Sequence, residues 1–234
     1  MNRVLFLFII FFALCAESGA QFLSYSSGPK SSSLSLGYCN HYFRFNDSEI
    51  ELTKREQIGF EKYVPEINYE TDNLRLSLAY NSSKFNGKNM ELFSVDGYYK
   101  LLVPVTRPDD FFVSIPVLLR TSYLKVIQEL EVSSSRIENG NVGLGTGIQL
   151  KQTFSGIGFR FIYDFCINYS TINFSIDYGY STQNEVIFAV DFDQIFDDFG
   201  IIFGGKYSDQ TWKISDKKYN YYTSVYGAFI GITF

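Results

Sequence analysis

The chain has 234 residues, a formal net charge of −5 at pH 7 and a high share of aromatic residues, 18% of the total. This mild acidity, without any basic stripe, excludes a nucleic-acid-binding surface. No apolar run approaches the length of about 18 residues that marks a transmembrane helix.

The N-terminal residues predict a secretory signal peptide. Arg3 supplies a positive charge, residues 4–14 form an apolar run of eleven, and small residues at 18–20 form a cleavage site before Gln21. Lipidation at Cys15 fits less well, because a leucine stands where lipidation sites want a small residue. We expect a signal peptide over residues 1–20 and one domain over residues 21–234. The leader carries one Arg and one Glu, so the mature chain keeps its net charge of −5.

The rest of the chain alternates in polarity with the period of two that is typical of β-strands. The clearest run, residues 157–169, is long enough to cross an outer membrane when the strand is tilted, at about 3.3 Å per residue. In chain order, the alternating runs are 34–39, 74–80, 111–119, 157–169, 172–180, 186–192, 201–207 and 222–234. Turn-forming residues separate them at 71–73, 86–87, 109–110, 138–140, 155–156, 170–171 and 183–184.

These runs predict an all-β fold, a closed antiparallel transmembrane β-barrel of about 12 strands. That count includes residues 124–132 as a strand; ten strands, or eight with long hairpins, are alternatives, and residues 123–136 could instead form a short helix. The longer connections, 46–57 and 208–219, are expected outside the membrane as candidate contact regions. A soluble β-sandwich is the competing fold, but thirteen-residue strands are too long for it.

The last strand ends on Phe234, with Tyr226, Ile230 and Ile232 on the same face. It resembles the C-terminal strand of bacterial outer-membrane barrels, whose closing residue is typically Phe. The resemblance implies that these four residues are a membrane insertion signal for the barrel-assembly machinery. It also implies that the protein resides in the bacterial outer membrane, in contact with outer-membrane lipid.

Tyrosines gather on the face that alternation assigns to lipid, near the strand ends. Amphipathic rings belong at the headgroup level, so they predict an aromatic girdle; a sugar-binding platform is the alternative. The tyrosines are Tyr38, Tyr63, Tyr69, Tyr80, Tyr163, Tyr169, Tyr178, Tyr180, Tyr207 and Tyr222.

The opposite face collects charges of both signs, which predicts a paired network that plugs a narrow lumen. A conducting channel would show rings of one sign instead. The predicted lumen network consists of Arg75, Arg120, Arg160, Asp164, Asp177 and Asp191. Lys62, Glu66, Lys151 and Lys206 share the same parity.

Catalysis finds little support in the sequence. His41 is the single histidine, so any His-based triad or metal site must use it, and no nucleophile motif surrounds it. We expect no enzyme activity, no cofactor and no metal. Cys39 and Cys166 are expected to be free, buried thiols, because the opposite walls of a wide barrel lie too far apart for a disulfide.

Three prolines fall within or at the ends of strand segments. Pro65, Pro104 and Pro116 lack the N–H group that a strand donates to its neighbour. Because a closed barrel has no free edge, we expect bulges or strand ends at these positions.

The segment 110–125, DFFVSIPVLLRTSYLK, resembles a recurrent stretch of the PorT-like outer-membrane barrels. The glycine-rich strand at 142–150, VGLGTGIQL, is similar to the next strand of that family, whereas Ser114 departs from an acidic position and the insertion between residues 123 and 142 is long. The matching residues are Phe112, Ile115, Pro116, Leu118, Leu119, Arg120 and Tyr123.

The PorT-like resemblance implies a non-enzymatic barrel, with an association with type IX secretion and surface delivery. The sequence therefore predicts an integral outer-membrane barrel with a structural or accessory role. Periplasmic or surface secretion components would be its partners. A small diffusion pore and an outer-membrane enzyme using His41 are the alternative functions.

Overall fold

The computed structural model describes the chain from residue 32 onwards, with gaps at the strand connections. The described residues are 32–47, 58–85, 88–106, 111–129, 134–172, 178–196, 199–214 and 219–234. The predicted signal peptide, Cys15 and Asp177 lie outside these residues. No helix among the described residues is long and apolar enough to cross a bilayer.

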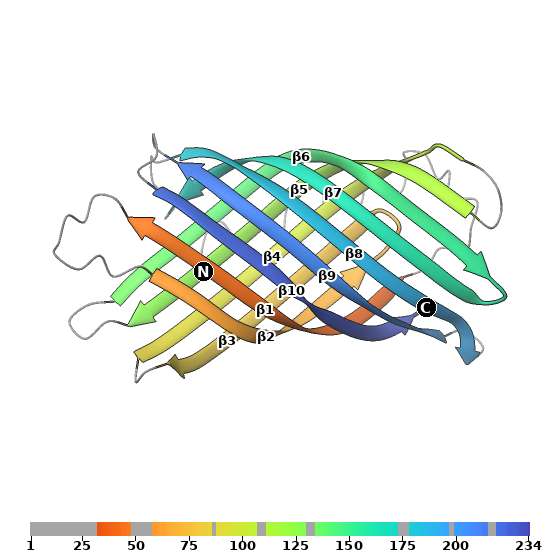
Figure 1. Ribbon diagram of the computed structural model, residues 1–234, viewed down its shortest axis with the longest axis horizontal. Coiled ribbons are helices and arrows are strands. Elements are labelled where there is room, and N and C mark those ends of the chain that lie inside the picture. Colours follow the sequence, from red (N-terminus) through yellow and green to blue (C-terminus); the bar gives the residue numbers. More distant parts are fainter. Residues whose placement is uncertain are drawn as a thin grey trace. The chain divides into compact units, whose positions relative to one another are not determined.

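The described residues form a closed antiparallel barrel of ten strands, which confirms the predicted fold class. Each strand pairs with its sequence neighbours, and the first pairs with the last (Figure 1). The strands are β1 (Ser33–Asp47), β2 (Ile58–Glu70), β3 (Leu74–Phe85), β4 (Lys88–Pro104), β5 (Phe111–Glu129), β6 (Ser134–Phe154), β7 (Ile157–Ile172), β8 (Tyr178–Phe196), β9 (Phe199–Ile214) and β10 (Tyr219–Thr233).

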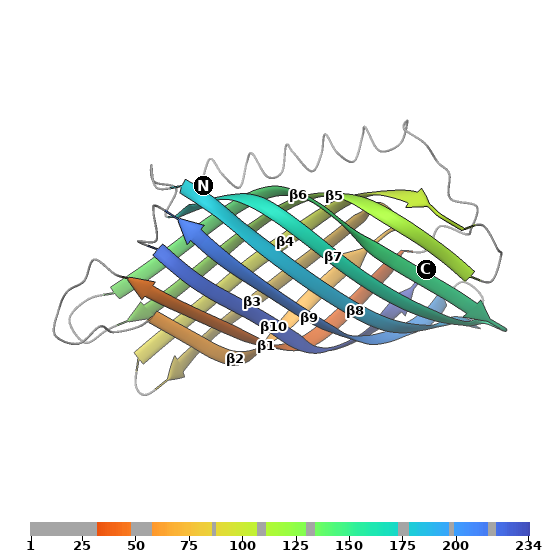
Figure 2. The same cartoon turned by 45° about the horizontal axis from the view of Figure 1, so that its top comes forward.

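The strands are steeply tilted, and those of the near wall cross those of the far wall (Figure 2). The even number places both ends of the barrel chain together: Ser33 pairs with Thr233, and Ser32 and Phe234 exchange two backbone hydrogen bonds of 2.9 Å. We call this end the terminal end and the opposite one the far end. Outer-membrane barrels of this kind have their termini on the periplasmic side.

The strand count is ten rather than about 12 because several polar segments continue through strands instead of breaking them. The turns at 71–73 and 155–156 are confirmed, and Ser155 and Gly156 have positive φ angles of 44° and 84°. The turns expected at 138–140, 170–171 and 183–184 are wrong, since these residues lie within β6, β7 and β8. The turns expected at 86–87 and 109–110 lie outside the described residues.

Polar side chains on the inner wall explain these errors. Asn139 and Ser170 are fully buried, and Gln183 is 4% exposed, all on the lumen side of the ladder. A polar lumen uses the same residue types as a turn, so the sequence pattern does not separate the two.

Two further expectations about segments are wrong. Residues 123–129 belong to β5 and residues 134–136 to β6, so neither a helix over 123–136 nor a separate strand over 124–132 forms. The expected outer connection 208–219 is mostly strand, because β9 continues to Ile214 and β10 begins at Tyr219. Most of the other connection, 48–57, lies outside the described residues.

The prolines interrupt strand pairing in two of three positions and end a strand in the third. Pro104 ends β4, as expected. The β5–β6 ladder has no pair at Ile115 and Pro116, although the register is the same on both sides. The β2–β3 ladder stops at Glu66, next to Pro65.

The outer wall is apolar over most of its height. Leu36, Leu144 and Ile230, for example, are each more than 60% exposed. Eight of the ten predicted girdle tyrosines are exposed outward, and Tyr38 stacks on Tyr63 with ring centroids 5.3 Å apart. An apolar surface of this extent is far larger than water-soluble proteins expose and matches a lipid-facing wall.

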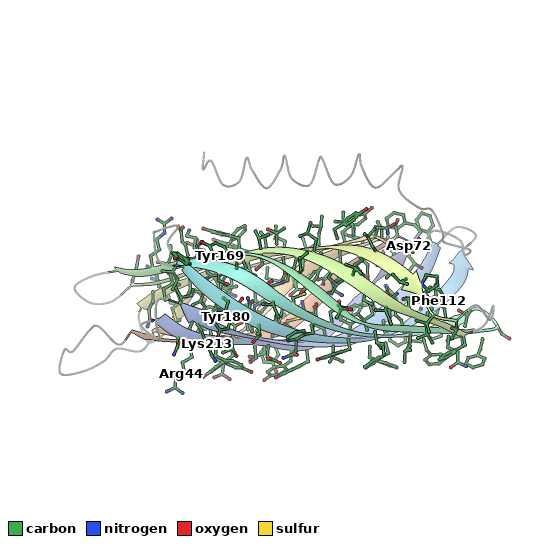
Figure 3. All side chains as sticks on the ribbon, turned by 90° about the horizontal axis from the view of Figure 1, so that it is seen from above. Arg44, Asp72, Phe112, Tyr169, Tyr180 and Lys213 are labelled. Atoms are coloured by element: carbon green, nitrogen blue, oxygen red, sulfur yellow. The ribbon has the colours of Figure 1, made fainter. Side chains whose placement is uncertain are left out.

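Labelled side chains mark the two ends of this wall. Arg44, Tyr169, Tyr180 and Lys213 lie towards the far end, and Asp72 and Phe112 towards the terminal end (Figure 3). The Lys213 ammonium lies 5.8 Å from the centre of the Tyr180 ring. Aromatic and cationic groups therefore meet at the far end, as at a membrane–water interface.

Candidate functional site: the barrel lumen

A three-residue ion cluster lies nearest the terminal end of the lumen. Glu70 is the last residue of β2. Its two carboxylate oxygens accept hydrogen bonds from Lys100 Nζ at 2.6 Å and from Arg160 Nη1 at 2.9 Å. Lys100 is 2% exposed and comes from β4, whereas Arg160 comes from β7 across the barrel. The cluster therefore ties opposite walls together.

Arg75 forms two deeply buried ion pairs in the lumen. Its Nη2 donates to Asp164 Oδ2 at 3.1 Å and also to Glu185, and the exposed fractions of the three side chains are 7%, 1% and 9%. Its guanidinium carbon lies 4.3 Å from the centre of the Tyr98 ring, a cation–π distance. One cation thus balances two carboxylates from β7 and β8.

Arg120 makes a second, bidentate pair beside the first. Its Nε and Nη2 donate to the two oxygens of Asp96 at 3.0 and 2.6 Å, and Nη2 also contacts Gln210 Oε1 at 3.3 Å. Its guanidinium carbon lies 5.6 Å from the centre of the Tyr98 ring. Bidentate geometry fixes the position of a guanidinium group as well as its charge. Arg75 and Arg120 thus share Tyr98.

His41 faces the lumen from β1, next to a third ion pair. Its Nε2 lies 3.6 Å from Glu66 Oε2, and Glu66 also pairs with Lys206. His41 is 6% exposed and Cys39, on the same face, is fully buried. Both Cys39 and Cys166 are free and buried, as expected.

A neutral polar layer lies above the charges, towards the far end. Asn141 donates to Ser122 at 2.8 Å, while its oxygen accepts from Ser170 at 2.6 Å and from the Trp212 indole at 2.9 Å. Ser181 continues the chain by contacting Ser170 at 2.9 Å. These short side chains satisfy one another's hydrogen-bonding groups and hold the Trp212 indole in place.

An apolar cluster fills the far half of the lumen, which is unusual because barrel interiors are normally polar. Every strand except β8 contributes to it, and Trp212 stacks on Tyr221 with centroids 4.2 Å apart. Its members are Phe43, Phe60, Val64, Ala79, Met90, Leu92, Val126, Ile137, Ile172, Trp212, Ile214 and Tyr221. Packed side chains therefore span the lumen from wall to wall.

Two small cavities lie in the middle of the lumen. One, of about 70 Å³, is lined by His41, Glu66, Arg75 and Tyr98 among others. Another, of about 60 Å³, lies between Arg120 and Trp212. Such volumes hold a few water molecules. No group of three or more His, Cys, Asp or Glu in the described chain could hold a metal ion.

Of the six predicted network residues, the structure pairs two with each other, pairs two more with other acids and buries a fifth on the lumen face. Arg75 and Asp164 pair directly, and Arg120 and Arg160 pair with other acids. Asp191 is buried on the lumen face of β8, opposite Gly158. Asp177 lies outside the described residues. Sequence reasoning missed four partners, Glu70, Asp96, Lys100 and Glu185.

A consistent parity count would have found these partners. Glu185 shares the parity of Asp191, but it adjoins the segment 183–184 that was expected to turn. Asp96 and Lys100 lie in β4, whose sequence does not alternate clearly in polarity. Glu70 shares the parity of Glu66 and directly precedes a turn.

Comparisons with known proteins identify the fold but no family. No known family model matches the sequence, and no curated protein matches it. Among solved structures, the outer membrane protease OmpT from Escherichia coli aligns with a TM-score of 0.60 at 6% identity, covering 92% of this chain and 99% of that chain. The chain has the fold of an outer-membrane β-barrel.

Other solved barrels align less closely. The N-terminal β-barrel domain of Pseudomonas aeruginosa OprF has a TM-score of 0.32 at 14% identity, covering 85% of this chain and 96% of that chain. Neisserial surface protein A has a TM-score of 0.30 at 12% identity, covering 85% and 97%. Likeness at these identities concerns the fold alone, so the protease activity named for OmpT is not carried over.

The predicted insertion signal lies on the outer wall of β10 and at the end that follows it. Tyr226, Ile230, Ile232 and Phe234 are between 44% and 61% exposed, and all share the outward parity. Their side chains form a continuous apolar row that ends at the terminal end of the barrel.

Removing Phe234 should impair assembly more than an internal change of similar exposure. Phe234 is 49% exposed at the terminal end, and Phe188, at 50%, faces outward from the middle of β8. We expect deletion of Phe234 to lower the amount of folded barrel in outer-membrane fractions, whereas Phe188→Leu leaves it near wild type. Heat-dependent gel mobility measures the folded fraction. Equal accumulation of the two variants would refute the insertion-signal role.

Proposed function

We propose that the protein is an integral outer-membrane barrel with a closed lumen and a structural or accessory, non-enzymatic role. The observation that carries this proposal is the filled interior: buried ion pairs in the middle and packed apolar side chains towards the far end. The apolar outer wall supports residence in a bilayer, because exposing so large an apolar surface to water is unfavourable.

Conductance distinguishes a closed barrel from a diffusion pore. Purified protein in planar bilayers should give no stable single-channel steps, because the apolar cluster spans the lumen. A general diffusion porin reconstituted in the same way serves as the positive control. Regular steps from the purified barrel, at a constant amplitude, would overturn the closed lumen.

The accessory role draws on the PorT-like resemblance, whose residues form one hairpin of the barrel. The segment 110–125 lies mostly on β5 and the glycine-rich 142–150 on β6, where Leu118 faces Gly145 and Arg120 faces Gly143. The glycines leave room in the lumen beside bulky partners. The shared residues therefore support a common way of building the wall, and a shared role in surface assembly follows only as part of the proposal.

Surface proteomics of the native host tests the accessory role. Cells lacking this barrel should display less of one or more surface proteins, and the wild-type chain supplied in trans should restore them. Labelling of intact cells with a membrane-impermeant reagent measures the display. An unchanged surface proteome would contradict a role in secretion or surface assembly.

The buried position of His41 supports a non-enzymatic role. A catalytic histidine must reach a substrate, but His41 is 6% exposed and its nearest charged neighbour, Glu66, is already paired with Lys206. The described lumen shows no hydroxyl or thiol hydrogen-bonded to this ring. A hydrolytic activity that His41→Ala abolishes in a folded barrel would overturn this part of the proposal.

A further inference from the structure

The lipid-facing wall is tall along β4–β7. On each of these strands, a stretch of thirteen residues places no charged side chain on the outer face. A strand tilted by about 40° rises roughly 2.5 Å per residue, so thirteen residues rise roughly 30 Å, the hydrocarbon thickness of a bilayer. We call these stretches the tall sector; they are residues 93–105, 111–123, 142–154 and 157–169.

The wall is much shorter on the β2–β3 hairpin. Its outward apolar and aromatic side chains lie within residues 63–69 of β2 and 74–80 of β3. Exposed polar residues follow towards the far end, beginning with Glu61 on β2 and Ser82 on β3, and Asp72 lies in the turn towards the terminal end (Figure 3). At the same tilt, seven residues rise only roughly 15–18 Å. We call this outer face of the hairpin the short sector.

Backbone pairing limits the hydrocarbon at this hairpin in the same place. β2 and β3 form five residue pairs, from Glu66–Ala79 to Glu70–Arg75, whereas β3 and β4 form 12. The two strands continue towards the far end, to Ile58 and Phe85, without pairing to each other. Backbone N–H and C=O groups without a partner do not face hydrocarbon, because no water is present there to bind them. Only the paired part of this seam can therefore face acyl chains.

Side chains at the seam agree with this limit. In the paired part, the facing outward residues Ile67 and Leu78 are 49% and 42% exposed. In the unpaired part, the Lys62 ammonium donates to Ser83 Oγ at 2.7 Å and to the Lys84 carbonyl oxygen at 3.4 Å, so a cation bridges the two strands. A charged group at this height is suited to water or lipid headgroups and not to acyl chains. Backbone and side chains therefore end the hydrocarbon at the same level.

We propose that the short sector thins the bilayer beside it and is preferentially covered by phospholipids with short acyl chains. A bilayer adapts to a short hydrophobic wall by thinning, at a cost that rises with each ångström of mismatch. Short-chain lipids avoid part of that cost, so they are enriched at this hairpin relative to the tall sector. The inference goes beyond the proposed function, since a closed accessory barrel needs no short side.

Tryptophans placed on the two sectors compare their lipid neighbours. Ile67 on β2 and Ile148 on β6 face outward near the middle of their stretches and are 49% and 43% exposed. Each is replaced by Trp in a Trp212→Phe background, which removes the single native tryptophan. The barrels are reconstituted in an equal mixture of dimyristoyl phosphatidylcholine and a phosphatidylcholine with brominated stearoyl chains. Bromine quenches indole fluorescence only at short range, so quenching measures the share of long-chain neighbours.

The Ile67→Trp barrel should be quenched less than the Ile148→Trp barrel in the mixed liposomes. We expect the ratio of short-chain to long-chain neighbours to be about twofold or more higher at Ile67→Trp, because the cost of mismatch accumulates over the missing height. In liposomes of the brominated lipid alone, both variants should be quenched to the same extent. That control shows that both positions contact lipid.

Two results would overturn the short sector. One is equal or stronger quenching of Ile67→Trp in the mixed liposomes. The other is absence of quenching of Ile67→Trp in brominated lipid alone. Heat-dependent gel mobility shows that each variant is folded. If Trp212→Phe does not fold, the same two substitutions are compared with Trp212 retained, because this residue is 1% exposed and contributes equally to both barrels.

Discussion

Replacing Arg75 with methionine is expected to destabilise the barrel by about 3–5 kcal/mol, because it leaves two carboxylates buried without their cation. Asp164 and Glu185 both depend on this guanidinium, and their side chains are 1% and 9% exposed. Methionine keeps most of the length of the side chain, so the loss of stability measures the removed charge more than the removed volume. Urea unfolding in liposomes, followed by gel mobility, measures the free energy.

A rim arginine provides the matched control. Arg136 pairs with Glu138, but its side chain is 54% exposed, so Arg136→Met should cost about 0–1 kcal/mol. Adding Asp164→Asn and Glu185→Gln to Arg75→Met should recover part of the lost stability, because no buried charge is then left unpaired. If Arg75→Met and Arg136→Met cost the same, the buried network does not stabilise this fold.

Alternation predicted the fold class because the outer wall is apolar over most of its height. Along β7, aromatic and aliphatic residues such as Phe159 and Phe161 face outward, while Arg160 and Asp164 face the lumen. A strand in a bilayer keeps this contrast over its full length, since no charge is tolerated on the lipid side. The same contrast placed Cys39, His41 and the described network residues on the inner wall.

Alternation disappears where the lumen itself is apolar. In the far half of β4, Met90 and Leu92 face inward while Phe93 faces outward, so apolar residues occur on both faces of the strand. The sequence pattern therefore does not indicate this strand, nor the lumen position of Asp96 and Lys100. Parity also says nothing about which charges meet, because Arg75 and Glu185 lie 110 residues apart and meet only after the barrel closes.

The apolar cluster and the short β2–β3 ladder likewise depend on closure of the barrel. No single strand shows that Phe43, Leu92 and Trp212 come together, since they lie on β1, β4 and β9. The irregularity expected at Pro65 was visible in the sequence, but its consequence was not. A proline lacks the N–H group that would hydrogen-bond to the neighbouring strand. Next to Pro65 the β2–β3 ladder ends, whereas beyond Pro116 the β5–β6 pairing resumes in the same register, so the outcome depends on the neighbouring strand.

Introducing a side chain at Gly147 should strongly destabilise the barrel. Gly147 faces the lumen from β6, and a Cβ atom there would lie 1.9 Å from the carbonyl oxygen of Tyr163 and 2.9 Å from Asp164 Oδ1. Because the nearest atom is backbone, β7 itself would have to move away. We expect Gly147→Ala to cost about 3 kcal/mol or more, the upper end of the penalty for overpacking.

Gly59→Ala is the matched control for this change, because it adds the same methyl group to another strand of the barrel. At Gly59 the nearest atom, the carbonyl oxygen of Phe43, would lie at an ordinary 3.7 Å. That substitution should be neutral or stabilising by up to about 1 kcal/mol, since alanine loses less conformational freedom on folding. Urea midpoints in liposomes compare the two variants. The close approach of β6 to β7 would be refuted if Gly147→Ala unfolded at the same urea concentration as Gly59→Ala.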